Sequence, residues 1–417
     1  MDILAIISLL IIISTLFAYV NLRVLKLPGT IGVITISVLV SIGILVAGKF
    51  GKSVGTPIVM LIENIDFSKV LLDVMLGFLL FASALHFDYK KLREQFKPIL
   101  VFSTIGVLIS TSVFGGLLYF ITNYVGVNIP LIYCLIFGAL ISPTDPIAVA
   151  AILKKTKIPK KLETIIAGES LFNDATGLIL FVTLLGLAQS TGSEFSWGHT
   201  LEHFAREVLG GIAVGVVLGY LGARLIHSIT DFQTILLITI SVVLGVSSVA
   251  NLIHASVPLG VVAAGLVVGN QTYDEANPAN KYLTNIWQVI DEVLNTILFV
   301  MIGLQLIVLP FLEHYWFMGL LSIVIVLIAR YVSILIPALP RIRKENPGSI
   351  GILTWGGLRG GISVAMALSL PASDYREVIL ASCYFIVIFS IIVQGLTLDK
   401  MVVAIMKKQE RKKLQTR

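Results

Sequence analysis

Charged residues are scarce in this chain: Asp, Glu, Lys and Arg together make up 13% of its 417 residues. Soluble proteins carry about 25% charged residues, so the sequence excludes a soluble globule of this size. Only two cysteines are present, Cys134 and Cys383, which excludes a disulfide scaffold. Glycine does not recur every third residue, which excludes a collagen-like chain, and the chain is too apolar to be disordered.

Apolar sequence takes the place of the missing charges. Hydrophobic residues make up 57% of the chain, and the mean hydropathy is +0.97. A membrane-spanning helix needs about 20 mainly apolar residues, and the stretch 98–144, which carries no charge, is long enough for two. Because backbone exposed to lipid must satisfy its own hydrogen bonds, such runs predict helices rather than barrel strands. We therefore predict an all-α polytopic membrane protein.

Glycine, proline and charges divide the apolar sequence into about 13 predicted transmembrane helices. Their ranges are 3–22, 29–48, 70–86, 98–122, 131–153, 163–189, 205–229, 233–252, 256–270, 286–309, 315–338, 348–370 and 376–406. No linker rich in proline, glycine or serine separates off a soluble domain. We therefore predict a single transmembrane unit at 1–406, followed by a short basic tail at 407–417.

Lys and Arg are distributed unevenly between the two sides of this bundle. If the N-terminus lies outside, the inner loops, helix ends and tail carry 23 basic residues and the outer side carries 5. Basic residues in short loops stay in the cytoplasm, so we predict a multi-pass cell-membrane protein with an outer N-terminus and a cytoplasmic C-terminus. The basic tail is expected to contact anionic membrane lipid. No nucleic-acid partner is expected, because the basic residues do not share one soluble face.

Five ionisable side chains stand out within the predicted apolar helices: Asp145, Glu169, Asp174, Arg330 and Arg359. An ionisable group near the middle of a bilayer costs a few kcal/mol. Each of the five is therefore a candidate functional residue. Asp73 is a weaker sixth candidate, because it lies near the start of its segment.

Asp145 belongs to a proline-flanked motif, Ser142-Pro143-Thr144-Asp145-Pro146, in the middle of 131–153. The two prolines remove backbone donors and push the preceding residues toward extended geometry, so the helix is predicted to be broken there. Broken helices at membrane depth line cavities, and their exposed carbonyls bind ions. A plain proline kink is the alternative interpretation, but it does not explain a carboxylate at this depth.

The segment 163–189 places polar residues on two adjacent helix faces. Ser170 and Asp174 share one face, and Glu169 and Asn173 share the next, because helical neighbours are three or four residues apart. This pattern predicts a helix that lines a cavity; a polar helix end near the cytoplasmic surface is the alternative. Carboxylate, hydroxyl and freed carbonyl oxygens suit a small hard cation.

A partly buried carboxylate can also hold a proton near neutral pH. One aspartate binds either H⁺ or a monovalent cation, but not both at once. If only the neutralised site crosses between inward and outward states, each cycle exchanges one proton for one cation. Such a mechanism needs no cofactor and no ATP, and no enzymatic activity is expected.

The two intramembrane arginines need partners. Arg330 has no acid near it in sequence, and Glu169 is its best candidate partner. Arg359 lies among four glycines at 356–361, which disfavour a continuous helix and predict a second interruption. A cation there could offset the carbonyl ends of facing half-helices. Structural ion pairing and a role in transport both remain open for these arginines.

The interrupted helices near 131–153 and 348–370 are the fifth and twelfth segments. Segments 4 to 6 and 11 to 13 thus occupy corresponding positions in two halves of the chain. This is the hydropathy pattern of an inverted-repeat antiporter fold, with the site where the two interrupted helices cross.

Three motifs in order resemble the signature stretches of the NhaP-type sodium/proton antiporters of the monovalent cation:proton antiporter (sodium/hydrogen exchanger) family. They are Ser142-Pro143-Thr144-Asp145-Pro146, Glu169-Ser170-Leu171-Phe172-Asn173-Asp174 and Trp355-Gly356-Gly357-Leu358-Arg359-Gly360. The resemblance extends over nearly the whole chain. It implies a homodimer with a six-helix core domain that moves like an elevator, here roughly 70–190 and 315–406, against scaffold helices at roughly 1–48 and 205–309. The short tail is similar to that of prokaryotic members.

The resemblance also implies roles for individual residues. Na⁺ would bind at Asp174, with Asp145, Ser170 and the Thr144 carbonyl as further ligands. Asn173 is similar to the residue of electroneutral members, whereas electrogenic relatives place a second Asp there. The stabilising ion pair would join Glu169 to Arg330, and Arg359 would belong to the crossing region. One departure is visible at Ala82, where some relatives carry a glutamate.

The predicted function is electroneutral exchange of Na⁺ or Li⁺ for H⁺ through Asp174. Exchange of K⁺ for H⁺ is the alternative within the same class, because the ligands do not reveal which ion radius is selected. A cation channel is a second alternative, although no filter motif repeats around a pore. An intramembrane enzyme with an aspartyl dyad of Asp145 and Asp174 is a third, but it would have no use for the buried arginines.

Overall fold

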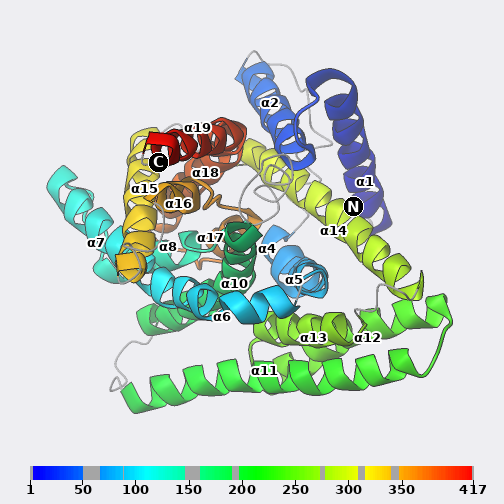
Figure 1. The fold of residues 1–417 in the computed structure, drawn as a ribbon. Helices are drawn as coiled ribbons and strands as arrows, with labels where there is room; N and C mark the ends of the chain where they lie inside the picture. Colours follow the sequence, from blue (N-terminus) through cyan, green and yellow to red (C-terminus); the bar gives the residue numbers. More distant parts are fainter. Residues whose placement is uncertain are drawn as a thin grey trace.

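The computed structural model describes residues 3–49, 66–87, 89–145, 160–189, 197–272, 278–308, 315–339 and 347–415. Within these ranges every regular element is helical (Figure 1). Ten of the described helical stretches are long and apolar enough to cross a membrane, and two shorter apolar helices accompany them. The predicted fold class, an all-α polytopic membrane protein, is therefore confirmed.

Each predicted segment corresponds to one helix or to a set of consecutive helices. The N-terminal half contains α1 (Ile3–Val20), α2 (Gly29–Lys49), α4 (Phe67–Lys69), α5 (Leu76–Leu85), α6 (Tyr89–Ser103), α7 (Ile105–Val125), α8 (Leu131–Ile141), α10 (Lys160–Gln189) and α11 (Trp197–His227). The C-terminal half contains α12 (Phe232–Leu252), α13 (Val257–Thr272), α14 (Pro278–Gln305), α15 (Trp316–Ala338), α16 (Pro347–Trp355), α17 (Gly361–Leu368), α18 (Arg376–Ile388) and α19 (Gly395–Gln415). Short turns of π-helix or 3₁₀-helix extend several of them, at Asn21–Leu25, Val70–Met75, Leu306–Val308 and Phe389–Gln394.

Helix boundaries differ from the prediction where charged residues are helical. The fourth segment begins at Tyr89 rather than near 98, because its basic side chains occupy the exposed positions of an amphipathic helix while Leu92 and Ile99 are buried. The segment is divided at Thr104, which separates α6 from α7. The helix α19 continues to Gln415, so most of the predicted tail is helical. The second half of the fifth segment lies outside the described residues.

Two hydrophobic clusters hold the bundle together. The larger one joins α2, α7, α8 and α14 to α15, α17 and α18. The smaller one joins α5, α12 and α13 around Trp287 of α14, whose indole nitrogen donates a 3.0 Å hydrogen bond to the Thr239 hydroxyl. The helix α5 thus packs mainly against helices of the predicted scaffold. The division of the chain into core and scaffold stays a prediction.

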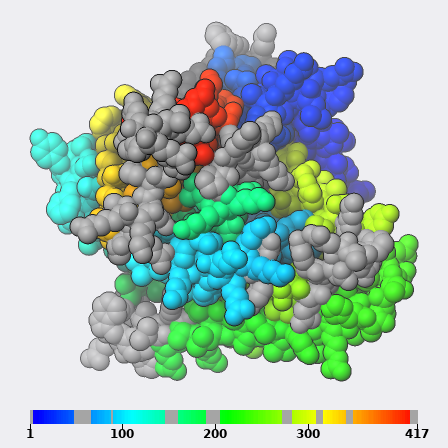
Figure 2. Space-filling view, viewed as in Figure 1, coloured from blue at the N-terminus to red at the C-terminus, as the bar shows by residue number. Residues whose placement is uncertain are grey.

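The fourth and eleventh segments, which correspond in the two predicted halves, lie beside one another. The helix α7 packs against both α8 and α15, and α15 packs against α16 and α18 (Figure 1). On the face turned to the viewer in Figure 2, α6 lies alongside the start of α10, and these two helices pack together. The bundle therefore surrounds the two short half-helices α8 and α17, which meet at its centre.

A seam of small residues joins two of the predicted scaffold helices. Gly211, Gly215 and Gly219 recur every four residues on α11 and face α13. A Cβ atom added at Gly219 would lie 2.8 Å from the Cα of Ala264, so the two backbones are in direct contact. Close backbone approach through small residues is how membrane helices pack tightly.

Candidate functional site

Two chain breaks meet at the centre of the bundle. The helix α8 ends at Ile141, and residues 142–145 continue without helical structure; α16 and α17 are separated by a similar break at 356–360. The backbone nitrogen of Asp145 donates a 2.7 Å hydrogen bond to the carbonyl oxygen of Leu358. The two interrupted segments predicted from the sequence therefore cross and are joined through their backbones.

Arg359 ties this crossing to its surroundings. Its side chain is buried, and its Nη1 donates to the carbonyl oxygens of Ser142 at 2.7 Å and of Pro143 at 3.2 Å. These carbonyls lie at the C-terminal end of α8, where the helix dipole is negative. Its backbone nitrogen donates to the hydroxyl of Ser390 at 2.9 Å. The guanidinium thus offsets a half-helix end, as its sequence position suggests.

The polar pair that supports the backbone beside Arg359, Ser390 and Gln394, was not predicted from the sequence. The Ser390 hydroxyl donates to Gln394 Oε1 at 2.6 Å, and Gln394 Nε2 donates to the Trp355 carbonyl oxygen at 3.2 Å. Both side chains belong to the π-helical turn Phe389–Gln394 and are buried. They satisfy the carbonyl oxygen at the end of α16 and a backbone nitrogen of the break, which a continuous helix would have satisfied itself.

Three hydrogen bonds join Thr144 to α10. Its hydroxyl lies 2.9 Å from the Ser170 hydroxyl and accepts a 2.8 Å bond from Asn173 Nδ2. Its backbone nitrogen donates to Asn173 Oδ1 at 3.3 Å. All three side chains are buried. The amide of Asn173 therefore replaces helical hydrogen bonds that the break removes, a role that the sequence did not indicate.

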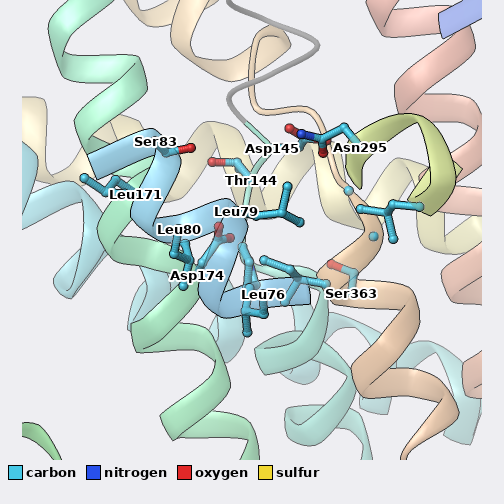
Figure 3. A pocket seen from close by; sticks show the side chains of 15 residues that line it. Leu76, Leu79, Leu80, Ser83, Thr144, Asp145, Leu171, Asp174, Asn295 and Ser363 are labelled. Carbon is cyan, nitrogen blue, oxygen red and sulfur yellow. The ribbon is translucent and has the colours of Figure 1, made fainter. Parts of the chain in front are cut away.

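A cavity with a volume of about 50 Å³ lies at this crossing. Its lining includes Asp145, Asp174 and the Thr144 segment, together with residues of α5, α14 and α17 (Figure 3). Ser170 and Asn173 lie behind this wall, bonded to Thr144. The structure thus brings all five predicted ion-site residues together, with three of them at the cavity and two supporting them.

Asp174 is the buried acid of the cavity. Its side chain is 8% exposed, and no hydrogen bond from the described residues reaches its carboxylate. The charge of Asp145 acts on it across the cavity. Two carboxylates that share a low-dielectric space repel each other, so such a pair attracts a proton or a cation. This arrangement allows one positive ion to be held and released.

Glu169 and Arg330 form a buried ion pair beside the crossing. The two Arg330 Nη atoms reach the two carboxylate oxygens of Glu169, and the Nη2–Oε2 distance is 2.9 Å. Arg330 Nη2 also donates to the Leu353 carbonyl oxygen at 3.3 Å. The pair is the one that the sequence predicts, and it connects α10, α15 and α16.

Two cavity residues were not singled out from the sequence. Asn295 of α14 and Ser363 of α17 both line the cavity and are buried. Asn295 bonds to Asp291, an acid in the middle of the membrane-spanning part of α14. The available signal was this acid within an apolar span, but the adjacent exposed Glu292 made the stretch resemble an ordinary amphipathic surface.

The crossing of two interrupted helices beside buried acids defines a class, the secondary ion transporters with interrupted crossing helices. A family model described as "Sodium/hydrogen exchanger, transmembrane" matches residues 11–404, and the chain belongs to this family. Over 402 residues it is 42% identical to the Na⁺/H⁺ antiporter NhaP of Pseudomonas aeruginosa. The aligned region covers 93% of this chain and 94% of that protein. The chain is 31% identical over 344 residues to the Na⁺/H⁺ antiporter NhaH of Halobacillus dabanensis, covering 81% and 83% of the two chains.

The fold is also similar to a solved structure. The sodium proton antiporter MjNhaP1 from Methanocaldococcus jannaschii at pH 8 superposes with a TM-score of 0.78 at 19% identity, covering 97% of this chain and 99% of that one. This similarity extends over nearly all of both chains. The antiporter fold predicted from the two interrupted segments is therefore confirmed.

Proposed function

We propose that this chain is a secondary active antiporter that exchanges Na⁺ or Li⁺ for H⁺ across the membrane. The observation that carries this proposal is the position of Asp174, a buried acid that lines the same cavity as the two crossing chain breaks. The family membership of the chain and the printed names of its relatives support it. Bound H⁺ and bound cation compete for Asp174, so only one of them crosses at a time.

The cation ligands are oxygens from two elements. Asp174 supplies a carboxylate from α10, and the chain break of α8 supplies Asp145 and the Thr144 carbonyl. The Ser170 hydroxyl, 2.9 Å from that of Thr144, is the fourth proposed ligand. Oxygen ligands of this kind suit small hard cations. Na⁺ is the cargo of the site and not a resident cofactor.

The exchange is electroneutral, one cation for one proton. Asn173 occupies the position next to Asp174 and carries no charge, and both ends of its amide are engaged with Thr144. It therefore holds the chain break in place without adding a second titrating acid. Asp174 is then the group that must be neutralised before the site can change from facing inward to facing outward.

The moving and fixed parts follow the predicted division of the chain. The core contains the crossing, and the scaffold contains α11 and α13, whose direct backbone contact suits a rigid support. Two copies of the chain form a homodimer through their scaffolds. The protein lies in the cell membrane with its N-terminus outside and its C-terminus in the cytoplasm, as the distribution of basic residues indicates.

The proposed exchange is tested with the purified protein in proteoliposomes that hold an imposed pH gradient. Addition of Na⁺ or Li⁺ is expected to dissipate the gradient, and an imposed membrane potential is expected to leave the rate unchanged. A faster response to K⁺ than to Na⁺ would replace this proposal with K⁺/H⁺ exchange. Currents without proton coupling would replace it with a channel.

A substitution at Gly360 tests whether the crossing geometry is needed. A Cβ atom at this position would lie 2.7 Å from the Cβ and 2.8 Å from the Oδ2 of Asp145, closer than real contacts allow. Gly360→Ala is therefore expected to displace Asp145 and to lower the exchange rate by about tenfold or more, since misplacing a binding group by about 1 Å is costly.

The matched control for this substitution is Gly116→Ala on α7, where an added Cβ meets no described atom within 4 Å. It is expected to keep the wild-type rate. An equal rate in the two variants would contradict the role of the Gly360 contact.

A further inference from the structure

The cavity at the crossing has a second polar wall, opposite the one that α10 provides. It is formed by Asn295 of α14 and Ser363 of α17, which line the cavity together with Asp145. Figure 3 shows Asp145 and Asn295 at one end of the view and Asp174 away from them among leucines. The proposed ligand set at Asp174 does not use this wall.

Asp291 stands directly behind Asn295 on the same helix. Asn295 Nδ2 donates to the carbonyl oxygen of Asp291 at 2.8 Å and to its Oδ1 at 3.0 Å. Both amide hydrogens are thereby used, and the Asn295 side chain is 1% exposed. The remaining polar atom of this side chain, its carbonyl oxygen, is an acceptor only. A cavity-lining acceptor beside a carboxylate favours a positively charged occupant.

Ser363 adds an oxygen that has no other use. Its side chain is 1% exposed, lines the cavity, and its hydroxyl has no hydrogen-bond partner among the described residues. A buried hydroxyl without a partner is energetically unfavourable. A ligand in the cavity would supply the missing interaction.

Three acids lie at or near the cavity: Asp145 and Asp174 line it, and Asp291 is bonded to the lining residue Asn295. The charge of Asp145 acts on both of the other acids. Among the described residues, the guanidinium of Arg359 donates to the carbonyls of α8, and that of Arg330 pairs with Glu169. Repulsion among the three acids is relieved when a cation enters the cavity.

We propose that Asn295 and Ser363 form, together with Asp145, a second binding station for a small monovalent cation, to which Asp291 behind Asn295 adds negative charge. The station receives Na⁺ or Li⁺ before the ion reaches Asp174, and Asp145 is shared between the two stations. This inference rests on the proposed exchange function, and it adds α14 and α17 to the elements that bind the ion. All of its ligands are oxygens, which small hard cations prefer.

The test compares the Na⁺ concentration that gives half-maximal exchange in proteoliposomes. Asp291→Asn is expected to raise this concentration by about tenfold, as expected for removing a charged partner, while the rate at saturating Na⁺ stays within about twofold of wild type. The matched control is Glu292→Gln, which removes the adjacent exposed acid and is expected to change neither value. Equal values for Asp291→Asn and Glu292→Gln would show that the second station does not exist.

A second readout separates ion binding from a purely structural role of Asp291. The melting temperature of the detergent-solubilised protein is measured in NaCl and in choline chloride of equal ionic strength, because a bound ion stabilises the folded state by mass action. Na⁺ is expected to stabilise Asp174→Asn still, and to lose this effect in Asp174→Asn/Asp291→Asn. Loss of all Na⁺ stabilisation in Asp174→Asn alone would overturn the proposal.

The exchanged pair Asp291→Asn/Asn295→Asp covers the case in which Asp291→Asn does not fold. It keeps one carboxylate and one amide a helical turn apart, so it is expected to recover most of the wild-type Na⁺ affinity. An exchanged variant that folds but does not recover the Na⁺ affinity would contradict the proposed second station. Absence of Na⁺/H⁺ exchange in the wild-type protein would contradict the proposed function. The comparisons among the Asp291, Glu292 and Asn295 variants test the second station alone.

Discussion

Replacing Asp174 by asparagine is expected to abolish Na⁺-dependent dissipation of a pH gradient, down to the rate of protein-free vesicles. The amide has nearly the same shape as the carboxylate but binds neither a proton nor a cation as a counter-charge. Because Asp174 is buried and lines the cavity, no solvent-exposed acid can take its place. The measurement is the rate of gradient dissipation in everted vesicles or proteoliposomes on addition of Na⁺.

Two further variants make this result specific. Asp174→Glu keeps a carboxylate in the cavity and is expected to retain partial exchange. Glu163→Gln removes an exposed acid from the first turn of the same helix and is expected to behave as wild type. Undiminished exchange in Asp174→Asn would remove this residue from the mechanism.

Replacing Arg330 by methionine is expected to lower the free energy of unfolding by about 3 to 5 kcal/mol. The substitution leaves the Glu169 carboxylate buried, at 2% exposure, without its counter-charge. It also removes a bond to the Leu353 carbonyl oxygen at the end of α16. The measurement is the melting temperature of the purified protein in detergent, together with its elution profile in size-exclusion chromatography.

The double variant Glu169→Gln/Arg330→Met identifies the cause of that loss. Removing both charges leaves no uncompensated ion, so the double variant is expected to be more stable than Arg330→Met alone and less destabilised than the two single losses added together. Strictly additive losses would mean that the two side chains act independently, which the bidentate contact makes difficult to explain.

Much of this fold could be predicted because membrane helices have few alternatives. Long apolar runs satisfy their backbone only as helices, so each of the predicted segments is present in the described residues, the fifth in part. The helix boundaries were less predictable where a helix contains charged side chains that point away from the protein interior. The basic start of α6 is helical because its charges point outward along one amphipathic face, and counting charges alone does not reveal that face.

The acids of the site could be predicted from their cost in a membrane, since Asp145, Asp174 and Glu169 stand out in apolar sequence. The supporting contacts could not, because they depend on which elements meet. The bonds of Asn173 to Thr144 and of Ser390 to Gln394 exist only because two helices are broken at the same place. Asp291 escaped notice for a related reason: its bonds with Asn295 cannot be read from the sequence, where it stands next to the exposed Glu292.

The guanidinium of Arg359 can be regarded as a tethered ion. It occupies the carbonyl oxygens of Ser142 and Pro143, which would otherwise attract an inorganic cation at the end of α8. Because it is attached to the chain, it cannot leave with the cargo, and it travels with the crossing wherever the crossing moves. The first carbonyl oxygen of the break to which it does not bond belongs to Thr144, so this oxygen remains available to the cation in the proposed one-for-one exchange.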